Sequence, residues 1–322
     1  MKIKLDRFVL AIIVVVVLAY FFPGLGSRES QVPLDRISSL GISLIFFFYG
    51  LKLSPDKIRA DLRNWKLHLL VQSSVFLLFP LIVLAFYPLL ASGENSAIWL
   101  AFLFMAALPS TVSSSVVMVS LAKGNVPAAI FNASISGLIG IMITPLWMGF
   151  FLEQQAGDFE LTDVYIKLLT EILLPVILGL LLNRFLGKYA VRYGSYLTLF
   201  DKSVILLIIY KSFVHSFEDN VFSSVGIQDF ALIYVGVLGM FFLVYFFIGF
   251  IADKLKFNRE DKITAQFCGT KKSLVHGTVF SKILFPATMP MGIILLPLML
   301  FHASQIFIIS VLATRLGHHT DK

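Results

Sequence analysis

Long apolar stretches recur along the whole chain and restrict its fold more than any other feature. Runs of about 20 apolar residues can each cross a hydrocarbon core of about 30 Å. Of the 322 residues, 58% are hydrophobic and only 14% are charged, whereas a soluble domain carries about 25% charged residues. A β-barrel would show short alternating segments instead. The sequence therefore predicts an all-α polytopic membrane protein.

The apolar runs divide into ten predicted transmembrane helices, separated by charged, proline or glycine positions. The run ending in Phe21-Phe22-Pro23-Gly24 has no small-residue cleavage site, so we interpret it as a span and not as a signal peptide. The predicted spans cover approximately residues 6–22, 34–53, 67–90, 97–122, 125–150, 164–186, 199–216, 228–252, 261–281 and 284–312.

The distribution of lysine and arginine predicts the orientation of these spans. With the N-terminus inside, 19 of the 26 basic residues fall on inner segments. Cytoplasmic segments carry the excess of such residues, so we expect a multi-pass protein of the cell (inner) membrane with both termini in the cytoplasm. The net charge of +7 then belongs to the loops, and no nucleic-acid partner is expected. The five outer basic residues are Arg28, Arg36, Lys167, Lys211 and Lys282.

An acidic connection near residue 160 divides the single membrane domain into two halves, residues 1–160 and 161–322. Each half contains five predicted spans, and this odd number means that the second half inserts upside down relative to the first. The count therefore predicts two inverted five-helix repeats, an arrangement common in secondary transporters.

The fourth span of each half has a polar interruption, LPSTVSSS at 108–115 and CGTKKS at 268–273. Paired interruptions of this kind are a strong sequence indication of a transporter's binding site. Pro109 removes a backbone donor and Gly269 tolerates non-helical torsions. Helix starts near Ser113 and Ser273 would then offer N–H groups to an anion, and free carbonyls with Ser, Thr and Asn oxygens can hold a small cation.

Lys271 and Lys272 lie in the second interruption, about ten residues from Lys262 and from Lys282. A lysine at the centre of a membrane helix costs about 2.5–3.5 kcal/mol on insertion scales. In the functional interpretation at least one of the pair binds substrate or couples transport to an ion. In the structural interpretation one reaches water in a cavity while the other pairs with a buried carboxylate, for which Glu171 is the candidate.

Other polar residues inside predicted spans extend this site. The substrate-binding candidates are Lys271, Lys272, Ser273, His276, Thr111 and Ser113. The candidates for cation binding or coupling are Gln72, Ser114, Ser115, Asn132, Ser136, Thr270 and Lys271. Asn132 and Ser136 share a helix face because they are four residues apart, although small polar residues also serve helix packing. A bonded structural role is the alternative for His276, and His68, His215 and His302 are expected near the membrane surface.

Enzyme motifs are absent from the sequence: it has no H-E-x-x-H, no G-x-S-x-G and no Walker loop. We therefore expect neither catalysis nor a cofactor, with Na⁺ as the one candidate ion. The lone Cys268 excludes an intrachain disulfide, and the sequence is silent on the oligomeric state.

Several motifs, in this order and spacing, resemble the bile acid:sodium symporter family in its atypical, orphan-like branch, as a bacterial homologue. They are Gly41 to Leu53 with its Gly-Leu close, Gln72 followed by Phe79-Pro80, Ala122-Lys123-Gly124-Asn125-Val126, and Cys268-Gly269 followed by Thr270-Lys271-Lys272-Ser273-Leu274. The resemblance implies ten spans in panel and core domains, with broken helices four and nine crossing in the core. It also implies cation ligands from the third, fourth, fifth and ninth spans.

Carried over by position, the resemblance assigns Gln72 and either Ser114 or Ser115 as ligands. The fifth-span hydroxyl positions align with Ala129 and Ala133, so Asn132 and Ser136 would have to substitute. The family's Glu-x-Gly-x-Gln-Asn motif aligns with residues 267–272, so that Phe267 replaces the Glu, Lys271 the Gln and Lys272 the Asn.

These departures lead to the hypothesis of a symporter-like carrier of a small organic anion whose coupling uses a lysine. Lys271 can stand in a cation site as a tethered charge, and because removal from water disfavours an ammonium, it can also release a proton. A residual sodium site near Ser114, Ser115 and Asn132 is the variant of this hypothesis. The alternatives are a membrane regulator or scaffold without a transport cycle, and a channel. The substrate stays open among steroid conjugates, smaller carboxylates, sulfates and vitamin precursors.

Overall fold

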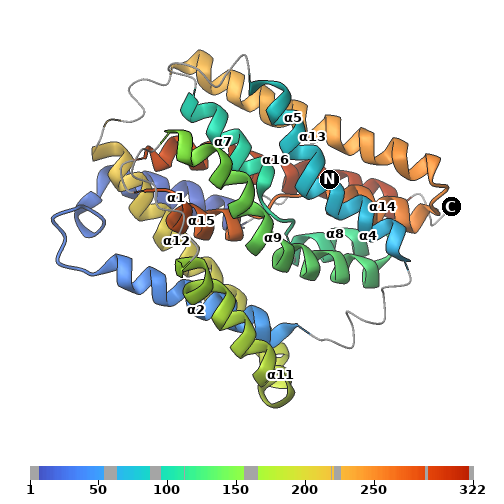
Figure 1. Cartoon of the computed structure of the whole chain (residues 1–322), viewed down its shortest axis with the longest axis horizontal. Coiled ribbons are helices and arrows are strands. Elements are labelled where there is room, and N and C mark those ends of the chain that lie inside the picture. Colours follow the sequence, from blue (N-terminus) through green and yellow to red (C-terminus); the bar gives the residue numbers. More distant parts are fainter. Residues whose placement is uncertain are drawn as a thin grey trace. The chain divides into compact units, whose positions relative to one another are not determined.

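The computed structural model describes residues 7–53, 64–87, 96–111, 113–155, 166–218, 220, 226–286 and 289–318. Every regular element in these ranges is helical, and no strand occurs among them (Figure 1). The all-helical prediction is therefore confirmed for the described part of the chain. The acidic connection at 156–165 lies outside it, so the two inverted repeats stay a prediction.

Within the described ranges, six helices are long and apolar enough to cross a membrane. They contain α2 (Leu34–Lys52), α4 (Trp65–Ser73) with η3 (Ser74–Leu78) and α5 (Phe79–Ala85), α9 (Val126–Gln155), η5 (Leu169–Leu173) with α11 (Leu174–Arg192), α13 (Ile227–Lys254) and α16 (Met291–His318). The other four predicted spans coincide with α1 (Arg7–Phe21), α12 (Gly194–Glu218), α7 (Ser96–Ala107) followed by α8 (Ser113–Leu121), and α14 (Arg259–Gly269) followed by α15 (Leu274–Leu284). The number of spans stays a prediction, while the polytopic membrane character is supported.

Large apolar side chains on these helices are exposed. Leu232 and Phe246 on α13 are 69% and 66% exposed, and Phe150 on α9 is 70% exposed. Only a third of the apolar window of α13 is buried inside the protein. A soluble protein rarely exposes contiguous apolar surface of this extent, whereas hydrocarbon accommodates it.

The chain forms two compact units, and each takes segments from both halves of the sequence. Unit 1 consists of Met1–Pro55, Leu152–Val225 and Thr278–Ile293, and unit 2 consists of Asp56–Phe151, Gly226–Gly277 and Ile294–Lys322.

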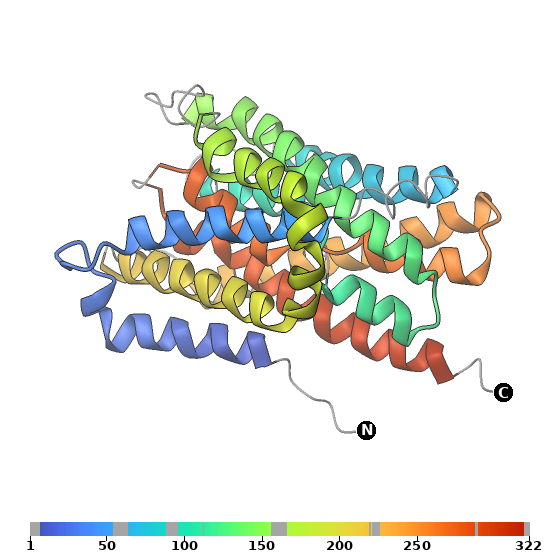
Figure 2. The same cartoon turned by 90° about the horizontal axis from the view of Figure 1, so that it is seen from below.

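In unit 1, α2 packs along α11 and α1 packs along α12 (Figures 1 and 2). Gly50 and Gly179 allow the backbones of α2 and α11 to approach closely. A Cβ on Gly50 would lie 2.2 Å from the Val176 carbonyl oxygen, and one on Gly179 would lie 2.2 Å from the Phe47 carbonyl oxygen. Small residues permit such approach of two membrane helix backbones.

Replacing Gly50 with alanine should destabilise the protein by about 2 kcal/mol, because the added methyl forces two backbones apart. The measurement is the thermal unfolding midpoint of the purified protein in detergent. Gly239→Ala on α13 is the matched control, since a Cβ there meets no atom within 4 Å. Equal midpoints for the two variants would contradict the close contact.

In unit 2, α14 packs against α4, α8 and α13, and α5 packs along α7. Both predicted polar interruptions coincide with helix breaks, because α7 ends at Ala107 before α8 begins at Ser113, and α14 ends at Gly269 before α15 begins at Leu274. The breaks bring non-helical backbone into the interior of this unit.

Candidate functional site

The first break leaves carbonyls at the end of α7 without helical partners, and other groups donate hydrogen bonds to those of residues 105–108. A helix end has four such carbonyls, and unsatisfied ones are costly away from water. The Leu108 N–H donates to the Met105 carbonyl at 3.3 Å, and the Thr144 hydroxyl donates to the Ala107 carbonyl at 2.8 Å. The carbonyls of Ala106 and Leu108 both accept from the Lys272 ammonium, at 2.6 and 2.9 Å.

A π-helical turn in the third predicted span frees two further carbonyls. The Phe79 N–H donates to the Ser74 carbonyl and bypasses that of Val75, and Pro80 has no N–H for the carbonyl of Phe76. The Trp147 indole donates to the Phe76 carbonyl at 2.8 Å. The Lys272 ammonium donates to the Val75 carbonyl at 2.7 Å.

Three backbone carbonyls therefore surround the Lys272 nitrogen. Three acceptors match the three donors of an ammonium, whereas a neutral amine has only two N–H groups. The nitrogen also lies 4.2 Å from the centre of the Phe79 ring, a favourable place for a cation. The residue is 0% exposed, and the negative end of α7 favours a positive charge here.

Hydrogen bonds also join the two breaks to each other. The Ser273 N–H donates to the Pro109 carbonyl at 2.9 Å, and the Ser110 hydroxyl donates to the Cys268 carbonyl at 2.7 Å. Gln305 on α16 clamps the second break, because its side chain accepts from the Lys272 N–H at 2.9 Å and donates to the Lys272 carbonyl at 2.8 Å. The Lys272 backbone and side chain thus connect α16, α7 and η3.

Lys271 lies in a different environment. Its ammonium is 3.5 Å from the Ser114 hydroxyl, which is longer than an ordinary hydrogen bond, although the residue is also 0% exposed. The Thr111 hydroxyl oxygen lies 2.8 Å from that of Ser114 and 3.1 Å from that of Ser115. Thus Lys271 adjoins a hydroxyl cluster at the start of α8, which we define as Thr111, Ser114 and Ser115.

Gln72 and Asn132 form a second polar cluster. The Gln72 amide donates to the carbonyl and to the side-chain oxygen of Asn132, both at 3.1 Å. The Asn132 amide lies 2.9 Å from His68 Nδ1 and donates to the Ala128 carbonyl at 2.9 Å. Gln72 Oε1 is buried and has no hydrogen-bond partner, so it is an oxygen suited to a small cation.

The remaining candidates are hydrogen-bonded to the backbone or to a neighbouring side chain. The Ser273 hydroxyl lies 2.9 Å from His276 Nδ1 and accepts from the His276 N–H at 3.3 Å, so it caps α15. The Thr270 hydroxyl donates to the Gln266 carbonyl at 2.6 Å. Ser136 accepts from the Ser110 N–H at 2.9 Å. Ser113 begins α8, and its side chain lies outside the described residues. These bonds favour structural roles for Ser273, His276, Thr270 and Ser136.

The structural interpretation of the two buried lysines is wrong. The structural interpretation had one lysine reach water and the other pair with a carboxylate, yet both are 0% exposed and Lys272 is bound by carbonyl oxygens. Backbone dipoles freed by the breaks stabilise this charge. His68 and His302 are buried within the protein, each 7% exposed, and reach Asn132 and Gln305, respectively. Their expected depth near the membrane surface stays a prediction.

Sequence reasoning missed the residues that contribute only backbone oxygens, namely Val75, Ala106 and Leu108, because a carbonyl carries no side-chain signal. It also missed Gln305, Ser110 and the Phe79 ring. Gln305 had a detectable signal, since it is a lone amide within the apolar run of the last predicted span.

The sequence profile of the SBF-like CPA transporter family matches residues 6–318. A protein of Pseudomonas aeruginosa named PA2026 is 38% identical over 98% of this chain and 94% of its own. YfeH of Escherichia coli K12 is 36% identical over 99% of this chain and 95% of its own. The sodium/bile acid cotransporter 7-B of Xenopus laevis is 28% identical over 97% of this chain and 91% of its own. The bile acid:sodium symporter resemblance is confirmed, and the chain belongs to the SBF-like CPA transporter family.

Proposed function

We propose that this protein is a secondary active transporter that carries a small organic anion across the inner membrane by alternating access, with both termini in the cytoplasm. The observation that carries the proposal is the pair of joined helix breaks with a lysine ammonium bound among their carbonyls. Discontinuous helices with charged residues at their breaks are typical of substrate and ion sites in transporters. The names of relatives, a candidate symporter and a sodium/bile acid cotransporter, support the same class.

In this proposal Lys272 is a fixed cation and takes no part in ion exchange. Three backbone carbonyls accept hydrogen bonds from its ammonium, and the Gln305 side chain accepts one from its backbone N–H. A sodium ion would use such oxygens as ligands, and the ammonium supplies the same charge without an ion from solution. Coupling through this position is then unnecessary.

Lys271 is the group that we assign to the substrate or to coupling. Among the described residues its ammonium has one polar contact, at 3.5 Å, so it is less constrained than that of Lys272. The hydroxyl cluster at the start of α8 adds donors beside it, and the positive end of that helix favours an anion. A carboxylate, sulfate or sulfonate can pair with Lys271 directly, or a proton can be exchanged there.

A residual sodium site at Gln72 and Asn132 is the weaker variant. Gln72 Oε1 is available, but the Asn132 side-chain oxygen already accepts from Gln72. The position that the resemblance gives to a ligating carboxylate is Phe267, which is 0% exposed and apolar. Sodium prefers several oxygen ligands, so this chain offers it fewer than its sodium-coupled relatives would.

The direct test is uptake by purified protein in proteoliposomes under imposed gradients of Na⁺ or H⁺. The labelled probes are a bile acid conjugate, a steroid sulfate and a small carboxylate. We expect saturable uptake of at least one probe that responds to the proton gradient and varies less than twofold when Na⁺ is replaced by K⁺.

Strict sodium dependence would contradict coupling through a lysine. Uptake that does not saturate would indicate a channel. If a well-folded preparation takes up none of the probes, and none raises its thermal midpoint, the regulator or scaffold alternative gains support, because a ligand stabilises the folded state to which it binds.

A further inference from the structure

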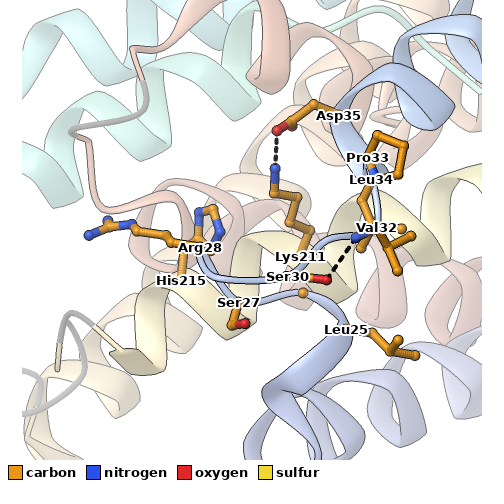
Figure 3. A pocket seen from close by; sticks show the side chains of 11 residues that line it. Leu25, Ser27, Arg28, Ser30, Val32, Pro33, Leu34, Asp35, Lys211 and His215 are labelled. Atoms are coloured by element: carbon orange, nitrogen blue, oxygen red, sulfur yellow. Dashed lines mark hydrogen bonds and ion pairs between the residues drawn. The ribbon is translucent and has the colours of Figure 1, made fainter.

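Unit 1 contains a cavity of about 300 Å³ that the transport proposal does not use. It lies between the 25–35 segment, which leads from η1 (Pro23–Leu25) into α2, and the end of α12 (Figure 3). Its size is at the lower limit of small-molecule sites in proteins. Polar side chains line it from both sides, among them Ser27, Arg28, Ser30, Asp35, Lys211 and His215.

The charges that line this cavity are mostly positive. Arg28 and Lys211 line it, and Lys282 of α15 adjoins it by donating to the Asp35 carbonyl at 2.8 Å and to the Ser38 hydroxyl at 2.6 Å. Three carboxylates oppose them: Asp35 forms an ion pair with Lys211 (Figure 3), Glu218 interacts electrostatically with His215, and Glu171 interacts electrostatically with Lys282. Among the residues that line the cavity, two cations, Arg28 and Lys211, face one carboxylate, Asp35, before any proton on His215.

Three of the five basic residues predicted at outer ends of the spans gather here. Arg28, Lys211 and Lys282 come from three separate segments. Basic residues are depleted on the outer side of membrane proteins, and like charges brought together repel unless an anion lies between them. Their convergence therefore favours the binding of an anionic group at this cavity.

Donor groups are present for such an anion. His215 Nε2 is buried and has no hydrogen-bond partner, and the residue lines the cavity beside Arg28. Ser30 accepts from the Val32 N–H at 3.2 Å, so its own hydroxyl hydrogen can be donated. The Arg28 guanidinium provides charge-assisted bonds to a carboxylate, sulfate or phosphate group. The Ser30 hydroxyl adds a neutral donor, and the His215 imidazole adds a donor at Nε2 when it carries a second proton.

We propose that this cavity is an anion-binding site, distinct in its residues from the helix breaks, that binds a small molecule or lipid through one carboxylate, sulfate or phosphate group. Arg28 and His215 hold the anionic group, and the Lys211–Asp35 pair closes the opposite wall. Binding here does not depend on the proposed transport.

The test titrates sulfate into the purified protein in a neutral detergent by calorimetry, at constant ionic strength with sodium chloride as the balancing salt. Arg28→Gln and His215→Gln should each weaken sulfate binding by about tenfold, the effect of losing one charge-assisted hydrogen bond. Lys188→Gln removes an exposed charge of unit 1 away from the cavity and should leave the affinity unchanged. Equal thermal midpoints without sulfate verify that each variant is folded.

A second arm identifies the source of the anionic group. Native mass spectrometry would compare adducts of phosphatidylglycerol with those of phosphatidylcholine in the wild type and in Arg28→Gln. If phosphatidylglycerol forms adducts with the wild type but not with Arg28→Gln, the site binds a lipid. If only sulfate binds, the site binds a soluble anion. The proposal is overturned if neither probe binds, or if binding is unchanged in both Arg28→Gln and His215→Gln, whatever the uptake experiments show.

Discussion

Replacing Lys272 with methionine should lower the thermal unfolding midpoint of the purified protein by roughly 5–10 °C. The substitution keeps most of the side-chain volume but removes the donors to the carbonyls of Val75, Ala106 and Leu108. Each buried acceptor left without a partner costs about 1–3 kcal/mol, and removing one partner of a buried charged contact costs about 3–5 kcal/mol in total. The loss should reach at least 3 kcal/mol.

Two further variants make this prediction specific. Thr144→Val deprives one carbonyl, that of Ala107, of its donor with little change of shape, so it should cost about 1–2 kcal/mol. Lys254→Met removes an exposed lysine from α13 and should stay within about 0.5 kcal/mol of the wild type. If Lys272→Met were no less stable than Lys254→Met, the carbonyls would have to find other donors, and the fixed-cation role would be wrong.

The position of the helix breaks was predictable because their causes lie in side chains. Pro109 removes a donor, Gly269 tolerates a break, and serines, threonines and two lysines interrupt otherwise apolar runs. Such residues are expensive in a continuous membrane helix. The apolar runs likewise predicted helices, because a membrane span leaves the backbone few other options.

The partners of Lys272 were not predictable in the same way. Its ligands are carbonyls, and which ones become free depends on a π-helical turn that shifts the Phe79 N–H to the Ser74 carbonyl. Pro80 indicates that the Phe76 carbonyl loses its partner, but nothing in the sequence indicates that of Val75. Which of two adjacent lysines points toward these oxygens is set by the backbone of the break.

Tertiary contacts also determine which partners the hydroxyl and amide candidates bind. Gln72 and Asn132 do meet, and His68 joins them through the Asn132 amide, a contact that the sequence did not indicate. Ser136 accepts a hydrogen bond from the Ser110 N–H, so it stabilises the first helix break. A polar residue within a span indicates a buried partner, and the sequence does not say which one.

Replacing Lys271 with methionine should reduce uptake at least tenfold while the protein keeps its stability, in contrast to the loss of stability expected for Lys272→Met. The Lys271 ammonium is 0% exposed and reaches one hydroxyl at 3.5 Å. Little bonding is lost on removing it, and a buried charge with few partners disappears. The thermal midpoint should therefore stay within about 2 °C of the wild type or rise. Uptake is measured with whichever probe the wild type transports best.

The comparison with Lys271→Gln separates substrate binding from coupling. Glutamine restores the oxygen ligand found at this position in the sodium-coupled relatives that the sequence resembles, but not the charge. If Lys271 couples transport to protons, Lys271→Gln should lose the response to the proton gradient while exchange of the anion across the membrane persists. If Lys271 binds the anion itself, both uptake and exchange should fall, and the probe should no longer raise the midpoint. Unchanged uptake in both variants would contradict both substrate binding and proton coupling by Lys271. Both buried lysines would then have only a structural role.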